Sequence, residues 1–273
     1  MIRRALRLVW WSSLYGLGLL PLRYRQGTWL KGFTAFYHRG HPERARHAFV
    51  DLEQFEHERH LRAGIFHRMK DHYPIPTTDK EAAQLWKEPP AICHLFSFIA
   101  RREQHPLRFL RWMRWLPLSG TVLEFGAGAA PLAWGLDMAW PFPRPTVHLV
   151  DIDWPLFDYC QWRFADSPKV RTLHTSHITS RSGPYDAIVC TETLEHVPDP
   201  VATARLLMSI LKPGGRLICD YGEQIKDQPM APRGKSARYY TLDYLFNAGL
   251  VLAISPHIVI EKLLAVDCER VTA

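Results

Sequence analysis

The stretch TVLEFGAGAAP, residues 121–131, sets a short apolar run against a glycine turn and a proline. Residues 122–125 predict a buried strand, and Gly126 and Gly128 predict a tight turn directly after it. Residues 131–136 predict a helix that begins with proline. A strand, a glycine turn and a helix in this order bring backbone N–H groups close to a ligand, so the stretch predicts a binding turn.

Two kinds of ligand fit such a turn: a dinucleotide, or another cofactor that carries adenosine. The dinucleotide pattern G-x-G-x-x-G requires a third glycine, and Pro131 occupies that position. The residues instead resemble motif I of the class I S-adenosylmethionine-dependent methyltransferases, E/D-x-G-x-G-x-G. Glu124, Gly126 and Gly128 match the motif, and Ala130 replaces its last glycine.

The residues downstream resemble the same family in the same order. Residues 147–150 predict a second strand ending in Asp151, and residues 185–190 predict another. A predicted helix over 201–211 leads into a turn that reads LKPGG, and residues 216–220 predict the next strand. The resemblance, close over residues 118–225, implies an α/β fold with a Rossmann-like, mostly parallel sheet of seven strands. It places a methyltransferase domain at residues 118–273.

The resemblance also implies which residues hold the cofactor, S-adenosylmethionine. Asp151 lies 25 residues after Gly126, where a carboxylate binds the ribose hydroxyls. Asp153 is predicted instead to cap the helix that runs to Phe164. Many relatives carry an acid that contacts the adenine, but residues 173–178 contain none, which leaves Ser176, His177 or the backbone. The expected cofactor-binding residues are Glu124, Phe125, Gly126, Ala127, Gly128, Asp151, Ile152, His177 and Thr191.

A second motif, E-x-x-E-H, follows the strand over residues 185–190. It consists of Glu192, Glu195 and His196, and it resembles the pattern of ubiquinone-pathway catechol O-methyltransferases and of the methyltransferases of small-RNA 3′ ends. That resemblance implies that the three side chains bind Mg²⁺ or another divalent ion, which activates a substrate hydroxyl. The alternative is a metal-free site in which His196 and Glu195 are catalytic, with His196 as base or orienting group.

The composition is that of an ordinary globular protein of 273 residues, with 47% hydrophobic and 22% charged residues. The net charge of +7 is uneven, because residues 1–118 hold 20 Lys and Arg against 10 Asp and Glu, whereas the remainder holds 14 against 17. The five cysteines form no Cys-x-x-Cys pair. Reduced, buried thiols are therefore expected, which favours a cytoplasmic protein.

Residues 1–117 predict a mainly helical cap on the substrate side. Within residues 1–37, an apolar run of about 15 residues is too short to span a bilayer, since a spanning helix needs about 20. It predicts either a helix that covers the cofactor pocket or an interfacial helix in peripheral contact with a membrane. Residues 40–73 predict an amphipathic helix whose four histidines favour a polar surface over a metal site.

Taken together, the sequence predicts an enzyme that transfers a methyl group from S-adenosylmethionine to a small or lipophilic hydroxylated molecule. One alternative is a ribose 2′-O-methyltransferase acting on RNA, which the basic cap would favour if it binds phosphates. Nucleic acid is the less expected partner. The other alternative is a partner protein that binds the cofactor without catalysing a reaction.

Overall fold

The computed structural model describes residues 115–117, 119–128, 144–221, 237–254 and 257–261, with single or paired positions at 13, 78, 80–81, 84, 130, 132–133 and 136. The predicted cap over residues 1–117, its four histidines and the helix within residues 1–37 lie almost wholly outside these residues. The domain boundary at residue 118 therefore stays a prediction.

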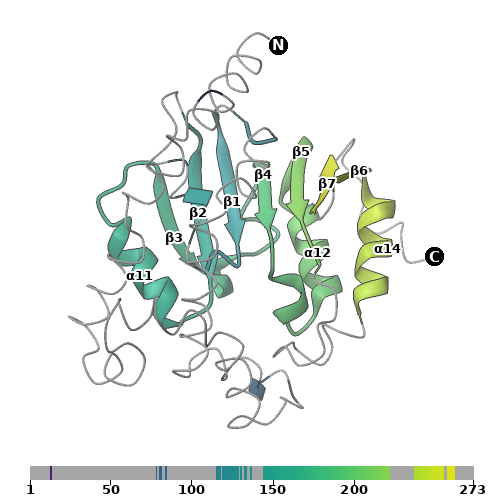
Figure 1. Cartoon of the computed structure of the whole chain (residues 1–273), viewed down its shortest axis with the longest axis horizontal. Helices are drawn as coiled ribbons and strands as arrows, with labels where there is room; N and C mark the ends of the chain where they lie inside the picture. The colour runs from purple at the N-terminus through teal and green to yellow at the C-terminus, as the bar shows by residue number, and fades with distance from the viewer. Residues whose placement is uncertain are drawn as a thin grey trace.

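One sheet organises the described residues, with strand order β3-β2-β1-β4-β5-β7-β6 (Figure 1). Five of its strands run parallel: β1 and β2 on either side of the glycine turn, then β3, β4 and β5. The remaining two, β7 and β6, extend the sheet in the antiparallel sense. The predicted α/β fold with a parallel sheet is thereby confirmed. The strands are β1 (Thr121–Phe125), β2 (Thr146–Asp151), β3 (Val170–His174), β4 (Tyr185–Cys190), β5 (Leu211–Cys219), β6 (Leu250–Ile254) and β7 (His257–Glu261).

The helices follow the strands in the alternation that parallel sheets require. Figure 1 shows α11 beside the β3 edge, with α12 and α14 toward the β5 side. Of two short 3₁₀ turns, η2 directly follows β3, and η3 follows β4 after a short loop. The bounds are α11 (Pro155–Arg163), η2 (Thr175–His177), η3 (Leu194–His196), α12 (Pro200–Ser209) and α14 (Arg238–Ala248).

The central strands are buried on both faces, which explains their continuous apolar sequences. Leu123 of β1, Ile188 of β4 and Leu217 of β5 are fully buried and pack in one cluster with Leu207 of α12 and Leu245 of α14. Burying one such side chain contributes about 1.5–3 kcal/mol. The core thus fixes which strands lie side by side, and thereby which strand ends are neighbours at the edge of the sheet.

The predicted strand over residues 185–190 coincides with β4, whereas the predicted LKPGG turn is wrong in its boundary. The structure extends β5 back to Leu211, so these residues belong to the strand. The pairing shifts from Tyr185↔Leu211 to Ala187↔Arg216, which leaves extra residues in β5 as an irregularity. Gly214 has φ of 71°, a conformation that a glycine adopts readily, and this lets the strand bulge rather than end.

No helix in the described part of the chain is long and apolar enough to cross a membrane.

At the amino edge of the sheet, Asp186 holds three strands together. Its carboxylate accepts a hydrogen bond from the N–H of Thr121 in β1 (2.8 Å) and pairs with the ammonium of Lys212 in β5 (2.7 Å). Burial alone would raise the pKa of Asp186, but the Lys212 contact and the Thr121 N–H outweigh it and the pKa lies below its usual value. The ionised carboxylate is therefore the form that stabilises the fold.

We expect Asp186→Ala to lower the free energy of unfolding by about 1–3 kcal/mol at pH 7, because it removes both contacts. A lowered pKa contributes stability above the unfolded-state pKa, and that contribution is lost as pH falls through the folded-state value. The difference between the variant and the wild type should therefore shrink below about pH 4. Urea unfolding at pH 7 and pH 3.5 measures it, with the exposed Asp166→Ala as control; an unchanged difference at the two pH values would contradict the assignment.

Candidate cofactor and acceptor site

The site lies where the chain changes direction across the sheet. From β1 it proceeds to β2 and β3 on one side, and it then returns to β4 and β5 on the other. The carboxyl ends of β1 and β4, which are neighbours, therefore bear loops that diverge. Open α/β sheets bind ligands in the crevice that such divergence leaves.

The glycine turn after β1 is tied to β2 by two hydrogen bonds. The N–H groups of Gly126 and Ala127 both donate to the carbonyl of Val150, at 2.9 and 3.0 Å. Gly126 and Gly128 have φ of 66° and 53°, which glycine adopts without a steric penalty. A Cβ at Gly128 would meet only the Trp154 ring, at 3.8 Å, so room remains beside this backbone.

Ala130 shows why the family motif carries a glycine at its last position. The residue has φ of 48°, the left-handed region in which an alanine Cβ crowds the backbone. It is fully buried, and its N–H donates to the carbonyl of Ala127 at 2.6 Å. The turn keeps its shape at this position despite the loss of glycine.

Glu124 lies beneath the turn, and the structure gives it a supporting position. Its side chain is buried, and its two carboxylate oxygens accept the N–H groups of Leu132 and Ala133, each at 3.2 Å. These residues are helical, and a carboxylate near the start of a helix satisfies N–H groups that lack a partner within the helix. Glu124 thus connects β1 to the residues after the turn. Phe125, the last residue of β1, is buried beside it.

Asp151 ends β2 and reaches the turn from the other side. One carboxylate oxygen accepts the N–H of Gly128 at 2.6 Å, and the other accepts the N–H of Ile152 at 2.8 Å. Burial raises the pKa of Asp151 to about 6, although the two N–H groups act in the opposite direction. The thiol of Cys160 in α11 donates to the carbonyl of Gly128 at 3.1 Å. Gly128 is therefore held at both its N–H and its carbonyl.

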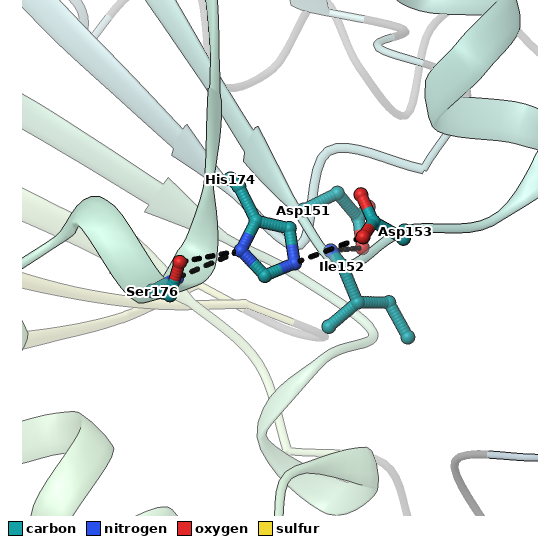
Figure 2. A network of polar contacts seen from close by, with 5 residues as sticks. All are labelled: Asp151, Ile152, Asp153, His174 and Ser176. Atoms are coloured by element: carbon teal, nitrogen blue, oxygen red, sulfur yellow. Dashed lines mark hydrogen bonds and ion pairs between the residues drawn. The ribbon is translucent and has the colours of Figure 1, made fainter.

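A second polar network follows the ends of β2 and β3 (Figure 2). The imidazole of His174 lies between Ser176, whose hydroxyl is 2.7 Å from Nδ1, and Asp153, whose carboxylate is 3.8 Å from Nε2. The N–H of Ser176 also donates to Nδ1, at 3.2 Å. This donation makes Nδ1 an acceptor and leaves the ring proton on Nε2, toward Asp153.

This network corrects the prediction that Asp153 caps the following helix. The N-cap of α11 is Trp154, and no side chain caps that end. The Asp153 side chain instead approaches His174, a residue that sequence reasoning passed over. An acid shortly before Pro155 is a pattern typical of a helix cap. The residue that Asp153 approaches, His174, lies on β3, and a contact of this kind is not visible in local sequence. His177 is exposed on η2, with its ring centroid 6.2 Å from that of His174.

The segment after β4 turns sharply before η3. Glu192 is exposed and has φ of 53°, and its N–H donates to a carboxylate oxygen of Asp220, which follows β5. The hydroxyl of Thr193 donates to the carbonyl of Thr191 at 2.9 Å. The N–H of His196 donates to the carbonyl of Thr193 at 2.8 Å. The turn and the 3₁₀ segment thus form one continuous hydrogen-bonded unit.

The three residues of the E-x-x-E-H motif do not converge. Glu195 is buried, whereas Glu192 is exposed and His196 is only partly buried. No three His, Cys, Asp or Glu side chains among the described residues are gathered in a way that would hold a metal ion. The predicted metal set is therefore not assembled in this structure. The three side chains differ in burial, and proximity in sequence does not by itself gather them around one point.

Glu195 faces a buried polar cluster at the ends of β4 and β5. Burial raises the pKa of Tyr221 to about 12, and the negative charge of Glu195 adds to the effect. Burial likewise raises the pKa of Cys190, with Cys219, Asp220 and Glu195 as further causes. Both groups therefore stay neutral at physiological pH. The sequence did not single out Asp220 or Tyr221, although a polar residue directly after an apolar strand is the available signal.

A family model described as a methyltransferase domain matches residues 94–249, more than half of the chain. The chain belongs to the S-adenosylmethionine-dependent methyltransferases. The match supports S-adenosylmethionine as the cofactor of this methyltransferase.

Curated relatives match only part of the methyltransferase. A ubiquinone biosynthesis O-methyltransferase of Xylella fastidiosa is 52% identical over 121 residues, which cover 41% of this chain and 46% of that protein. Its counterpart in Xanthomonas axonopodis pv. citri is 57% identical over 37 residues, 14% of this chain and 16% of that protein. The chain thus spans less than half the length of these relatives. A solved O-methyltransferase family protein from Burkholderia thailandensis has a TM-score of 0.48 at 11% identity, over 76% of this chain and 68% of that one. This score is too low to support an argument.

The residues around the glycine turn fit S-adenosylmethionine. The backbone at Gly128 leaves space that a side chain would fill, and Asp151 stands directly beside it. A carboxylate offers about four lone-pair positions; the N–H groups of Gly128 and Ile152 use two and the Trp154 side chain is a third partner, which leaves a position for a ribose hydroxyl. The acid and the turn are therefore joined directly, and their binding of the cofactor stays a prediction.

We expect Asp151→Ala to weaken binding of S-adenosylhomocysteine by about tenfold or more, because hydroxyl donors lose a charged acceptor. Binding that favours the ionised carboxylate lowers its pKa from about 6, so wild-type affinity should fall as pH is lowered from 8 to 5. The variant should lose that share of the pH dependence. Calorimetry at both pH values measures it, with Asp166→Ala as control; equal affinities of the variant and the wild type at pH 8 would refute the assignment.

Proposed function

We propose that this methyltransferase acts on the hydroxyl oxygen of a small or lipophilic hydroxylated molecule. The observation that carries the proposal is the contact between the turn after β1 and the turn after β4. A Cβ at Gly126 would overlap the Thr193 side chain, so the segment that bears His196 lies directly against the glycine turn. This contact supports a site in which the cofactor and the candidate catalytic side chains are neighbours.

The glycine turn and Asp151 supply the cofactor side of this proposal. When bound, S-adenosylmethionine supplies a methyl group activated on a positively charged sulfur. The backbone of residues 126–128 and the carboxylate of Asp151 hold and orient the ligand, with Glu124 and Cys160 supporting them from beneath. Orientation of two reactants accounts for a large share of the rate in displacement reactions of this kind.

His196 supplies the acceptor side. An acceptor hydroxyl that takes a methyl group must lose its proton, and a neutral imidazole can take that proton near pH 7. His196 is partly buried, and its backbone is fixed to Thr193. Glu195, the other candidate catalytic residue, is buried within the same 3₁₀ segment.

The names of the curated relatives support oxygen as the acceptor atom, over the part of the chain that they match. A divalent ion does not enter the proposed reaction, because Glu192, Glu195 and His196 do not form a ligand set. The proposal instead assigns catalysis to the proximity of the two reactants and to one general base, His196. Peripheral membrane contact through residues 1–37 remains a proposal of its own.

The test is transfer of a labelled methyl group from S-adenosylmethionine to catechol, to phenol and to a short RNA, each with Mg²⁺ and with chelator. We expect transfer to a hydroxylated aromatic and little to RNA. His196→Ala and His196→Gln should lower kcat by about a hundredfold while leaving affinity for S-adenosylhomocysteine within about twofold.

Three outcomes would contradict this proposal. Transfer to RNA alone would favour the ribose methyltransferase. Loss of turnover in chelator, restored by Mg²⁺, would revive the metal set. Binding of S-adenosylhomocysteine without turnover on any acceptor would favour the catalytically silent partner protein.

A further inference from the structure

The turn after β4 holds a residue in an unfavourable backbone conformation. Glu192 and Ala130 are the two non-glycine residues with positive φ in the described part of the chain. In the left-handed region the Cβ of an L-residue approaches the backbone carbonyl, so the conformation needs support from its surroundings. Glu192 itself is exposed.

Support comes from Asp220, which directly follows β5. Its side chain is nearly buried, and Oδ1 accepts the N–H of Glu192 at 2.5 Å. The parallel register pairs Cys190 with Cys219, so both strands end at the same level and the bond bridges their ends. A carboxylate acceptor makes this hydrogen bond stronger than one between neutral groups.

The turn after β4 also contacts the glycine turn after β1. The Thr193 side chain fills the space that a Cβ of Gly126 would occupy. The Thr193 hydroxyl is fixed in turn, since it donates to the carbonyl of Thr191 at 2.9 Å. A change of backbone conformation at Glu192 would therefore displace the next side chain, which is the one in contact with Gly126.

We propose that Asp220 is a positioning residue for the cofactor turn. By holding Glu192 in the left-handed conformation, it keeps Thr193 against Gly126 and so keeps the glycine turn of residues 126–128 in place. This inference rests on the proposed binding of S-adenosylmethionine at that turn. It assigns to the end of β5 a role in a site otherwise built from the ends of β1, β2 and β4.

The test uses the full chain, with S-adenosylhomocysteine as the probe and calorimetry as the measurement. We expect Asp220→Ala to weaken binding about tenfold, since one charge-assisted hydrogen bond is lost and part of that loss is transmitted to the ligand. Asp220→Asn keeps an acceptor oxygen and should weaken binding by less than about threefold. Asp199→Ala is the matched control, because Asp199 also accepts a backbone N–H, that of Ala202 at 2.8 Å, but at the exposed start of α12. It should destabilise the protein without changing the affinity.

A second substitution at Glu192 separates positioning from general destabilisation. Asp220→Ala combined with Glu192→Gly should bind within about threefold of Glu192→Gly alone, because glycine adopts positive φ without support. Asp220→Ala combined with Glu192→Ala should remain weakened, because alanine retains the steric penalty. If Asp220→Ala does not fold, Asp220→Asn in the same two backgrounds supplies the comparison.

The possible results separate this inference from the proposed function. A wild-type chain that does not bind the probe overturns both. A wild-type chain that binds, with Asp220→Ala binding equally well, overturns the positioning role alone. Equal recovery by glycine and by alanine at position 192 would also overturn it, because the conformation of Glu192 would then not be what Asp220 controls.

Discussion

The close contact between the turns after β1 and β4 is the constraint on which the site depends. The two strands are neighbours, yet the chain leaves them in opposite directions, so their turns must share the carboxyl edge. Gly126 meets this requirement because a Cβ there would overlap the Thr193 side chain. The cofactor turn and the segment that bears His196 therefore cannot be shaped independently of each other.

Buried carboxylates hold this edge in place. Glu124 binds the N–H groups of Leu132 and Ala133, Asp151 binds those of Gly128 and Ile152, and Asp220 binds that of Glu192. Burying an acid is unfavourable unless donors surround it, and backbone N–H groups at turns are donors that lack regular partners. Each pairing satisfies both groups and fixes a loop before any ligand arrives, which lowers the cost of binding.

The two sides of this carboxyl edge differ in their electrostatics. On the side of β2, burial raises the pKa of Asp151 to about 6. On the side of β5, burial and the charge of Glu195 keep Tyr221 neutral up to about pH 12. The titratable groups on the two sides therefore differ in the pH range over which their charge changes.

The amino-acid sequence by itself determined the alternation of strands and helices, because apolar runs such as residues 185–190 must be buried, and it determined the glycine turn, because few residues tolerate its conformation. It also identified Asp151 and the E-x-x-E-H segment as candidate site residues. Only the tertiary structure decided which groups the polar side chains contact. Asp153 approaches His174 rather than capping α11, the three predicted metal ligands are not gathered into a metal-binding group, and Asp220 reaches Glu192 across 28 positions of sequence. The reason is that local patterns report backbone preference and burial, whereas a hydrogen bond between strand ends depends on strand order and register.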